Sequence, residues 1–305
     1  MDSNRGTAIT YRYLSNMEKL FEIRDLQCSY DRRNHKRIVL DIERLIIPKG
    51  KKVFIVGESG IGKSTILEVL GLMNNTIVPN DNSAFIFYDD GKPVDILALW
   101  KRNDDTELSN FRRKHFNFIF QSTNLMRNFT AYENISITRM LQGYDRESSF
   151  GKASEVLDYL GLNQIDESRM AQELSGGQQQ RLAFARAIIP DFSVLFGDEP
   201  TGNLDNYNAV KAMELLSAKL GELKGSSAVI VTHDMHLAVS FADIIIKIKK
   251  EMNPAGRNGE DSSFHGKITE DCIYCVTPDR LYWENSSQRY GTTEFENFIR
   301  HEENE

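Results

Sequence analysis

Short runs of consecutive apolar residues recur along the chain, each just before a polar, glycine-rich or acidic turn. They predict strands at 53–56, 118–120, 194–196, 229–231 and 244–248. Continuous rather than alternating apolarity is typical of strands covered on both faces, as in a parallel sheet flanked by helices. The first four runs end at residues with candidate chemistry, where open α/β sheets bind their ligands. The pattern therefore predicts an α/β fold.

Apolar residues at helical spacing fill the intervals between these strands. One such pattern follows Ser64 and predicts a short buried helix, and another within 178–189 ends before Pro190, which stops a helix. Residues 122–175 carry little strand signal and more helical pattern. We expect this segment to be a helical insertion between two strands.

Two stretches are rich in Asn, Asp, Gly or Ser, residue types that favour turns over regular elements. They cover about 99–110 and 249–264, and we expect both to be loop expansions. At 305 residues, with 40% hydrophobic and 27% charged residues, the chain can bury a sizeable core. No run approaches the roughly 18 to 20 apolar residues of a membrane helix, and the N-terminus lacks a signal-peptide segment. A cytosolic protein is expected.

The net charge of −7 argues against a general nucleic-acid binder, which usually shows a basic face. The one basic cluster, at 112–115, is interpreted as a solvated surface. Cys272 and Cys275 form a lone CxxC whose apolar neighbours favour a strand. Side chains three apart on a strand point to opposite faces, so a buried or half-buried thiol pair is expected rather than redox or zinc chemistry.

The segment GESGIGKST matches the phosphate-loop pattern GxxxxGK[ST], after an apolar run and before a helical pattern. Its glycines let successive backbone N–H groups face phosphates. The lysine would reach the β- and γ-phosphates, and the serine hydroxyl would ligate Mg²⁺. The candidate nucleotide-binding residues are Gly57, Glu58, Ser59, Gly60, Ile61, Gly62, Lys63, Ser64 and Thr65. Such loops serve kinases, GTPases, motors and transport ATPases alike.

Two adjacent carboxylates end the apolar strand in SVLFGDEPTGNLD. Asp198 at the strand tip can hold Mg²⁺ through water, and Glu199 can orient and deprotonate the water that attacks the γ-phosphate. A general base of this kind contributes ~10²–10⁴-fold to the rate. With the phosphate loop upstream, the pair predicts nucleotide hydrolysis.

The order GESGIGKST, Gln121, LSGGQQQR, GDEPTGNLD and VTHD resembles that of an ABC-type ATPase. The resemblance covers roughly 20–248 and the segment HGKITED. It implies an ATPase domain over 1–271: a P-loop NTPase fold with a RecA-like core, an N-terminal antiparallel β subdomain and a helical subdomain at about 122–176. Residues 272–305 have no counterpart, and their acidic end is compatible with a short amphipathic helix.

The resemblance also implies roles for single residues. Tyr30 stands where the family has an aromatic that stacks on adenine. Gln121 corresponds to the glutamine that senses Mg²⁺ and the γ-phosphate and links the core to the helical insertion. His233 corresponds to the histidine that contacts the γ-phosphate, and Asp205 to the aspartate of the loop that communicates between paired subunits.

The segment ELSGGQQQRLAFARA resembles the family's signature motif. A helix N-terminus is a ready anion site without a lysine, because its N–H groups are exposed and its dipole end is positive. In the family, two subunits pair head to tail, so Ser175, Gly176, Gly177 and Gln178 would close over the ATP held by the partner's phosphate loop. One set of motifs in the chain implies a homodimer or a pair with a homologous chain.

The neighbouring sequence RRKHFNFIFQSTNLMRNFTAYENI, with SGGQQQR and DEPTGNLD, resembles ATPases of lipoprotein release, macrolide efflux and cell division. In that group the partner permease is typically a separate or fused four-helix membrane protein, and much of the group does mechanical work across the membrane. Because no membrane segment occurs in this chain, we expect a separately encoded permease and a cytoplasmic subunit at the inner face of the cell membrane. Two alternatives remain open: a soluble ABC ATPase acting on nucleic acid, and a regulatory module that dimerises on ATP. No nucleic-acid partner is expected, and the substrate stays open.

Overall fold

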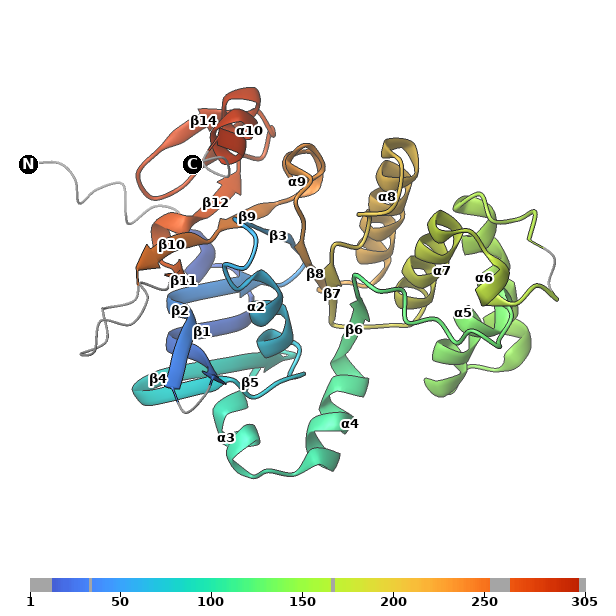
Figure 1. The fold of residues 1–305 in the computed structure, drawn as a ribbon, viewed down its shortest axis with the longest axis horizontal. Helices are drawn as coiled ribbons and strands as arrows, with labels where there is room; N and C mark the ends of the chain where they lie inside the picture. The colour runs from blue at the N-terminus through green and yellow to red at the C-terminus, as the bar shows by residue number, and fades with distance from the viewer. Residues whose placement is uncertain (1–12, 33–34, 166–167, 253–263, 302–305) are drawn as a thin grey trace, which may run out of the picture. The chain divides into compact units, whose positions relative to one another are not determined.

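The computed structural model describes residues 13–32, 35–165, 168–252 and 264–301. The chain divides into two compact units, one formed by 1–112 with 231–305 and the other by 113–230 (Figure 1). Each unit carries some of the candidate site residues.

The first unit contains a six-stranded sheet in the order β10-β11-β2-β1-β4-β5. The two long strands β1 and β2 pair antiparallel, and β11 joins β2 in parallel register with Gly266 opposite Leu40. Alternate residues of β1, among them Phe21 and Ile23, are fully buried. The strands are β1 (Lys19–Arg32), β2 (His35–Pro48), β4 (Ile77–Asp89), β5 (Lys92–Asp95), β10 (Lys249–Met252) and β11 (Phe264–Ile268). The antiparallel β region is thus present.

A second group of strands in this unit follows the order β14-β13-β12-β9-β3. Strand β3 pairs parallel with β9, as the two apolar runs predict, and the remaining pairs are antiparallel. The strands are β3 (Lys52–Val56), β9 (Ile244–Lys247), β12 (Ile273–Val276), β13 (Tyr282–Glu284) and β14 (Arg289–Gly291). The associated helices are α2 (Lys63–Leu70), α9 (Met235–Phe241) and α10 (Thr292–His301).

The expectation of a loop at 99–110 is wrong for most of that stretch. Helix α3 (Ile96–Lys101) and helix α4 (Asp105–His115) cover it. Aspartates cap both helices: Asp95, just before the stretch, accepts from the backbone N–H of Ala98 at 3.1 Å, and Asp104 within it accepts from that of Glu107 at 3.0 Å. Capping satisfies backbone donors that an isolated helix start leaves open.

The second predicted expansion, 249–264, begins with strand β10 and ends on the first residue of β11. These two strands pair antiparallel, with Met252 opposite Phe264. Residues 253–263 lie outside the described residues. The ends of this stretch are therefore a hairpin rather than irregular chain.

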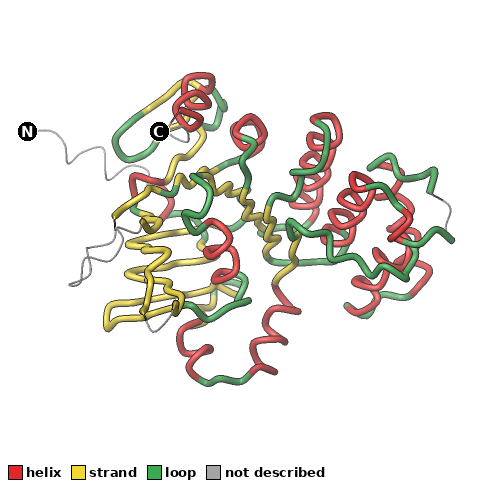
Figure 2. The backbone as a smooth tube through the Cα atoms, in the orientation of Figure 1, coloured by secondary structure: helices red, strands yellow, loops and turns green. Residues whose placement is uncertain are grey.

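The second unit contains strands in the order β8-β7-β6, and β6 pairs parallel with β7. They confirm the apolar runs: β6 (Phe116–Ile119), β7 (Val194–Asp198) and β8 (Ser227–Val231), whose last residue falls in the first unit. Helices make up most of the rest, as the red segments of Figure 2 show. They are α5 (Ala131–Leu141), α6 (Arg146–Tyr159), the 3₁₀ turn η1 (Ala171–Glu173), α7 (Gly176–Ile188) and α8 (Asn206–Glu222).

The insertion between β6 and β7 is helical, as predicted, and has a hydrophobic core of its own. Ile135 from α5, Leu157 from α6 and Leu182 from α7 are all fully buried in this core. The buried side chain of Asn134 accepts from the N–H of Met126 at 2.9 Å and donates to its carbonyl at 3.0 Å. These bonds fix the chain where it enters α5.

Residues 272–301 form an ordered addition to the first unit. Strand β12 pairs with β9, and Trp283 stacks on Phe295 of α10 with ring centroids 5.0 Å apart. The short amphipathic helix expected near the end of the chain is confirmed as α10. Cys272 lies in the 3₁₀ turn η2 (Glu270–Cys272) and Cys275 in β12; both thiols are buried, and burial raises the pKa of Cys275 to about 12.

None of the helices formed by the described residues is both long enough and apolar enough to cross a membrane.

Candidate nucleotide-binding site

The phosphate loop connects β3 to α2 and curls around the ammonium group of Lys63. The Nζ atom of this buried lysine donates to the carbonyl of Gly57 at 2.5 Å and to that of Glu58 at 2.8 Å. Gly57, Gly60 and Gly62 have φ values of 150°, 77° and 105°, which side chains rarely allow. A loop with this backbone and a lysine at its centre fits a phosphate group.

The ring of Tyr30 lies beside the first turns of α2. Its hydroxyl is 3.5 Å from both Oγ1 of Thr65 and Oε2 of Glu68, and it accepts from Nδ2 of Asn74 at 3.2 Å. Tyr30 is 37% exposed, so part of it is accessible to solvent next to the phosphate-loop helix. This placement fits an aromatic that packs on a nucleotide base.

His233 is exposed in the turn between β8 and α9. The neighbouring Thr232 fixes this turn: its N–H donates to the carbonyl of Ile55 in β3 at 3.4 Å, and its hydroxyl accepts from the N–H of Asp234 at 3.0 Å. Asp234 then caps α9 by accepting from the N–H of Leu237 at 2.9 Å. The histidine thus occupies a turn tied to the strand that enters the phosphate loop.

In the second unit, Asp198 ends strand β7 and Glu199 follows in a left-handed conformation, with φ of 49°. This backbone costs roughly 1–2 kcal/mol for a residue with a Cβ atom. The turn is closed by Gly202, whose N–H donates to the Glu199 carbonyl at 3.2 Å. Strain at a carboxylate is typical of functional positions, where the surrounding structure imposes it.

Gln180 holds this turn from helix α7, and the sequence reasoning did not single it out. Its side chain is fully buried, and Nε2 donates to the carbonyl of Pro200, next to Glu199, at 3.0 Å. Gln180 lies four residues before the buried Phe184. A polar residue at that spacing on an apolar helix face is the signal that could have revealed it.

Ser175 caps helix α7 with a reciprocal pair of hydrogen bonds. Its N–H donates to Oε1 of Gln178 at 2.9 Å, and its hydroxyl accepts from the N–H of Gln178 at 3.4 Å. Neither Gly176 nor Gly177 has a left-handed backbone. A Cβ atom at Gly176 would meet nothing within 4 Å, and one at Gly177 only the Asn203 carbonyl at 3.9 Å. The fold of the described chain does not require glycine at either position.

Gln121 is exposed two residues after the end of β6. The loop that follows it is held by Arg186 of α7, whose guanidinium donates to the carbonyls of Thr123 at 3.1 Å and Asn124 at 2.8 Å. Burial lowers the pKa of Arg186. A cavity of about 480 Å³ adjoins this loop, lined by Ser122, Thr123, Asn124, Leu125, Arg127, Ala171, Gln172 and Gln179.

Asp205 caps helix α8, and its side chain is exposed to solvent. It accepts from the backbone N–H of Asn208 at 2.9 Å and from its side-chain Nδ2 at 2.7 Å. These hydrogen bonds lower the pKa of Asp205. The structure thus gives this residue a capping role that the sequence reasoning did not anticipate.

The predicted residues fall into two groups. The first unit carries the phosphate loop, Tyr30 and His233, and the second carries Gln121, Asp198, Glu199, Asp205 and the turn 175–178. Within each group, short hydrogen bonds fix the segments that bear them.

The ABC transporter family model matches residues 40–202. The lipoprotein-releasing system ATP-binding protein LolD of Colwellia psychrerythraea is 34% identical over 81% of this chain and 90% of its own length. The macrolide export ATP-binding/permease protein MacB of Shewanella sp. strain ANA-3 is 37% identical over 77% of this chain, which spans only 34% of that longer protein.

A solved structure extends the match. The dimeric post-hydrolysis state of the ATP-binding cassette MJ0796, bound to ADP and Pi, aligns with a TM-score of 0.64 and 31% identity, covering 75% of this chain and 94% of that one. CbiO1 from Clostridium perfringens, at 22% identity and a TM-score of 0.59, agrees in fold. The chain belongs to the ABC transporter family and is an ATPase of that family.

Proposed function

We propose that two copies of this chain pair head to tail and bind ATP between them, each phosphate loop facing the partner's turn 175–178. The observation that carries the proposal is the pair Gly176 and Gly177, which the described chain does not need for its own backbone or packing. Glycines at an exposed helix N-terminus permit an anion and a second backbone to approach closely. A related cassette, MJ0796, has a dimeric structure bound to ADP and Pi.

Each named residue then has a role in this composite site. Lys63 would bind the β- and γ-phosphates, Tyr30 would pack on the adenine, and Ser175 with Gln178 would present the helix end to the γ-phosphate. His233 and Gln121 would contact the γ-phosphate region. Asp205, its carboxylate already oriented by Asn208, would face the partner.

A bound Mg²⁺ would neutralise charge on the β- and γ-phosphate oxygens. Ser64, at the start of α2, Asp198, at the tip of β7, and Gln121 are the residues that would hold it. Hydroxyl and carboxylate oxygens are the ligands that magnesium prefers. Glu199, whose backbone is in the left-handed region, would take the proton of the attacking water.

We further propose that ATP-driven pairing moves a membrane permease carried on a separate chain, with this subunit at the inner face of the cell membrane. The names of the relatives, which combine ATP binding with permease activity or lipoprotein release, support a membrane partner. The 480 Å³ cavity beside the loop after Gln121 offers a contact surface next to a γ-phosphate-sensing residue. We propose that the ATPase does mechanical work on the permease, rather than driving the passage of a solute through it.

In this proposal residues 1–271 form the ATPase domain, with a helical subdomain at about 122–176, and residues 272–305 are an extension to it.

The test is a Glu199→Gln variant in which hydrolysis is blocked. We expect it to bind ATP, to lose at least ~10²-fold in turnover, and to elute as a dimer only with ATP. Affinity capture of the tagged chain from detergent-solubilised membranes should recover an integral membrane protein. A variant that stays monomeric with ATP would overturn the pairing, and recovery of nucleic acid instead of a membrane protein would overturn the permease proposal.

A further inference from the structure

The β10–β11 hairpin packs directly on the phosphate loop. A Cβ atom at Gly266 of β11 would lie 2.1 Å from the carbonyl oxygen of Ile61 and 2.7 Å from Cγ2 of Ile248. A Cβ atom at Gly57 would in turn lie 3.3 Å from the carbonyl oxygen of Ile248, the residue before β10. The backbones of the hairpin and of the phosphate loop are therefore in close contact here, and we expect a movement of the hairpin to shift the loop.

An ion pair joins the two segments at the rim of the loop. The Nζ atom of Lys250 in β10 donates to Oε2 of Glu58 at 2.6 Å. The backbone carbonyl of the same Glu58 accepts from Nζ of Lys63 at 2.8 Å. Lys250 also lies over the ring of Phe264, 4.8 Å from its centroid, which restricts the lysine side chain to this face of the hairpin.

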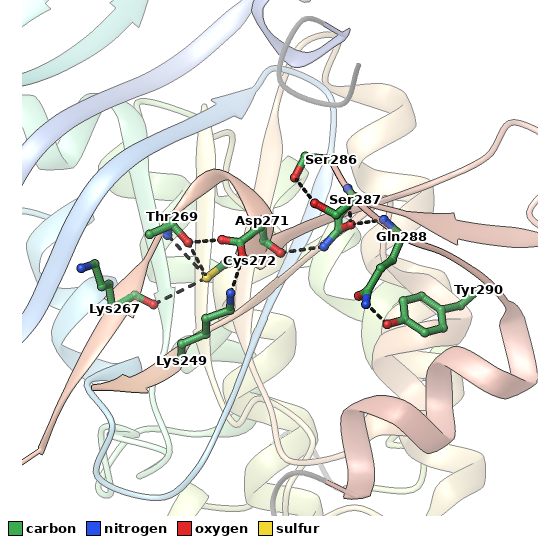
Figure 3. Close-up of polar contacts among 10 residues, drawn as sticks. Lys249, Lys267, Thr269, Asp271, Cys272, Ser286, Ser287, Gln288 and Tyr290 are labelled. Atoms are coloured by element: carbon green, nitrogen blue, oxygen red, sulfur yellow. Dashed lines mark hydrogen bonds and ion pairs between the residues drawn. The ribbon is translucent and has the colours of Figure 1, made fainter. Parts of the chain in front are cut away.

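The neighbouring Lys249 anchors the same strand from its other face. Successive side chains of a strand point to opposite faces, and Lys249 forms an ion pair with Asp271 (Figure 3). The backbone carbonyl of Asp271 accepts from Nδ2 of Asn285 at 2.7 Å. Strand β10 is thus held between Asp271, which Asn285 of the C-terminal extension contacts, and Glu58.

We propose that Lys250 is a positioning residue for ATP: it neutralises Glu58 and holds that carboxylate away from the incoming phosphates. ATP carries several negative charges, and an uncompensated carboxylate on the phosphate loop repels them. Lys250 acts through Glu58 and does not touch the nucleotide. The proposal concerns ATP binding by a single chain and does not depend on dimer formation or on a permease.

The size of the effect follows from the exposure of the pair, whose side chains are 39% and 30% accessible. Exposed ion pairs are worth about 0.2–1 kcal/mol, which corresponds to about 1.4- to 5-fold in an equilibrium constant. Lys250→Met should therefore raise the Kd and KM for ATP by about 1.4- to 5-fold at low ionic strength. We expect kcat to stay at the wild-type value, because the substitution leaves the residues proposed to catalyse hydrolysis unchanged.

The experiment is a double-mutant cycle of Lys250→Met and Glu58→Gln, with equilibrium ATP binding and steady-state hydrolysis measured at low and high salt. We expect Lys250→Met to weaken ATP binding in the wild-type background but not in Glu58→Gln, and Lys250→Arg to retain wild-type affinity. High salt should reduce the difference, since it screens exposed charges.

Lys267→Met is the matched control. It breaks a comparable ion pair on the same hairpin, Lys267–Glu251 at 2.9 Å, without involving the phosphate loop, so ATP affinity should stay at the wild-type value. The proposal is overturned if Lys250→Met leaves the Kd for ATP unchanged. It is also overturned if the loss persists in Glu58→Gln, since Lys250 would then act on the nucleotide itself.

Discussion

The side-chain amide of Gln180 donates to the carbonyl of Pro200 at 3.0 Å and thereby joins helix α7 to the turn that carries Glu199. The donor is fully buried. This bond links helix α7, which Ser175 caps, to the turn that follows strand β7. We expect its loss to disturb the position of Glu199.

Replacing Gln180 by methionine should lower kcat more than it changes the KM for ATP. The side chain keeps its length, but the Pro200 carbonyl loses its buried donor, at a cost of about 1–3 kcal/mol in unfolding free energy. Gln179→Met is the control, because the neighbouring amide donates to the Leu174 carbonyl at 2.9 Å instead. Steady-state kinetics and urea unfolding of both variants measure these effects. An equal kcat in the two variants would show that Gln180 does not position the turn that carries Glu199.

The backbone of Glu199 permits a comparison between two inactive variants. With φ of 49°, the position favours glycine over any residue with a Cβ atom. We expect Glu199→Gly to be more stable than Glu199→Ala by up to about 1 kcal/mol, although glycine normally loses more chain entropy on folding. Denaturant unfolding of both proteins measures this difference. A more stable alanine variant would show that the turn is not strained.

Gly266 offers a test of the hairpin's contact with the phosphate loop. Gly266→Ala places a methyl group on the Ile61 carbonyl and should cost about 1–3 kcal/mol while weakening ATP binding. Gly221 in α8 has open space around it, so Gly221→Ala should leave binding unchanged and add up to about 1 kcal/mol of stability. Calorimetry with ATP would compare them. Equal ATP affinity in the two variants would contradict the close contact.

The sequence predicted those features that a local pattern encodes. The phosphate loop, strands β3, β7 and β8, and the helix after Ser175 each depend on residues within a few positions of one another. The bounds of strands β1 and β2 were not predicted, because their alternation of apolar and polar residues can be interpreted only once the partner strand is known.

Contacts between residues far apart in the sequence could not be predicted from local patterns. Lys250 and Glu58 lie 192 residues apart in the sequence. Gln180 contacts Pro200 through its side-chain amide, and the signature motif alone assigns no role to that side chain. The polar composition of 99–110 was misleading for a related reason. Asp104 in this stretch caps helix α4, and a capping residue cannot be told from a loop residue until the backbone N–H that donates to it is known.

Asp191 predicts how the second unit responds to acid. Burial would raise the pKa of this carboxyl, but hydrogen bonds from Tyr144 at 2.8 Å and Lys219 at 3.1 Å outweigh burial and lower it. A carboxyl with a lowered pKa stabilises the fold above its unfolded pKa of about 3.9 and loses that contribution as the pH falls through its folded value. Asp191→Asn should therefore be less stable than wild type at neutral pH.

Urea unfolding across a pH series checks this sign. The stability difference between wild type and Asp191→Asn should be constant from neutral pH down to about pH 5 and shrink below about pH 4. Glu155→Gln is a suitable control, since its ion pair with Lys152 lies on the exposed surface of α6. A difference that persists unchanged at pH 3 would show that the charge of Asp191 is not the source of its contribution.

The composite site makes a prediction that a mixture of two defective chains tests most directly. In a Glu199→Gln background, Ser175→Arg blocks the helix end and Lys63→Ala removes the phosphate-binding lysine. Neither chain should dimerise alone, because each homodimer lacks a complete site. The mixture retains one site, with Lys63 from one chain and Ser175 from the other.

Energy transfer between chains carrying different fluorophores, titrated with ATP, measures that association. We predict ATP-dependent pairing in the mixture and none in either variant alone. A mixture that stays monomeric, or a Ser175→Arg chain that pairs with itself as well as with its complement, would contradict a nucleotide site shared between two copies of the chain.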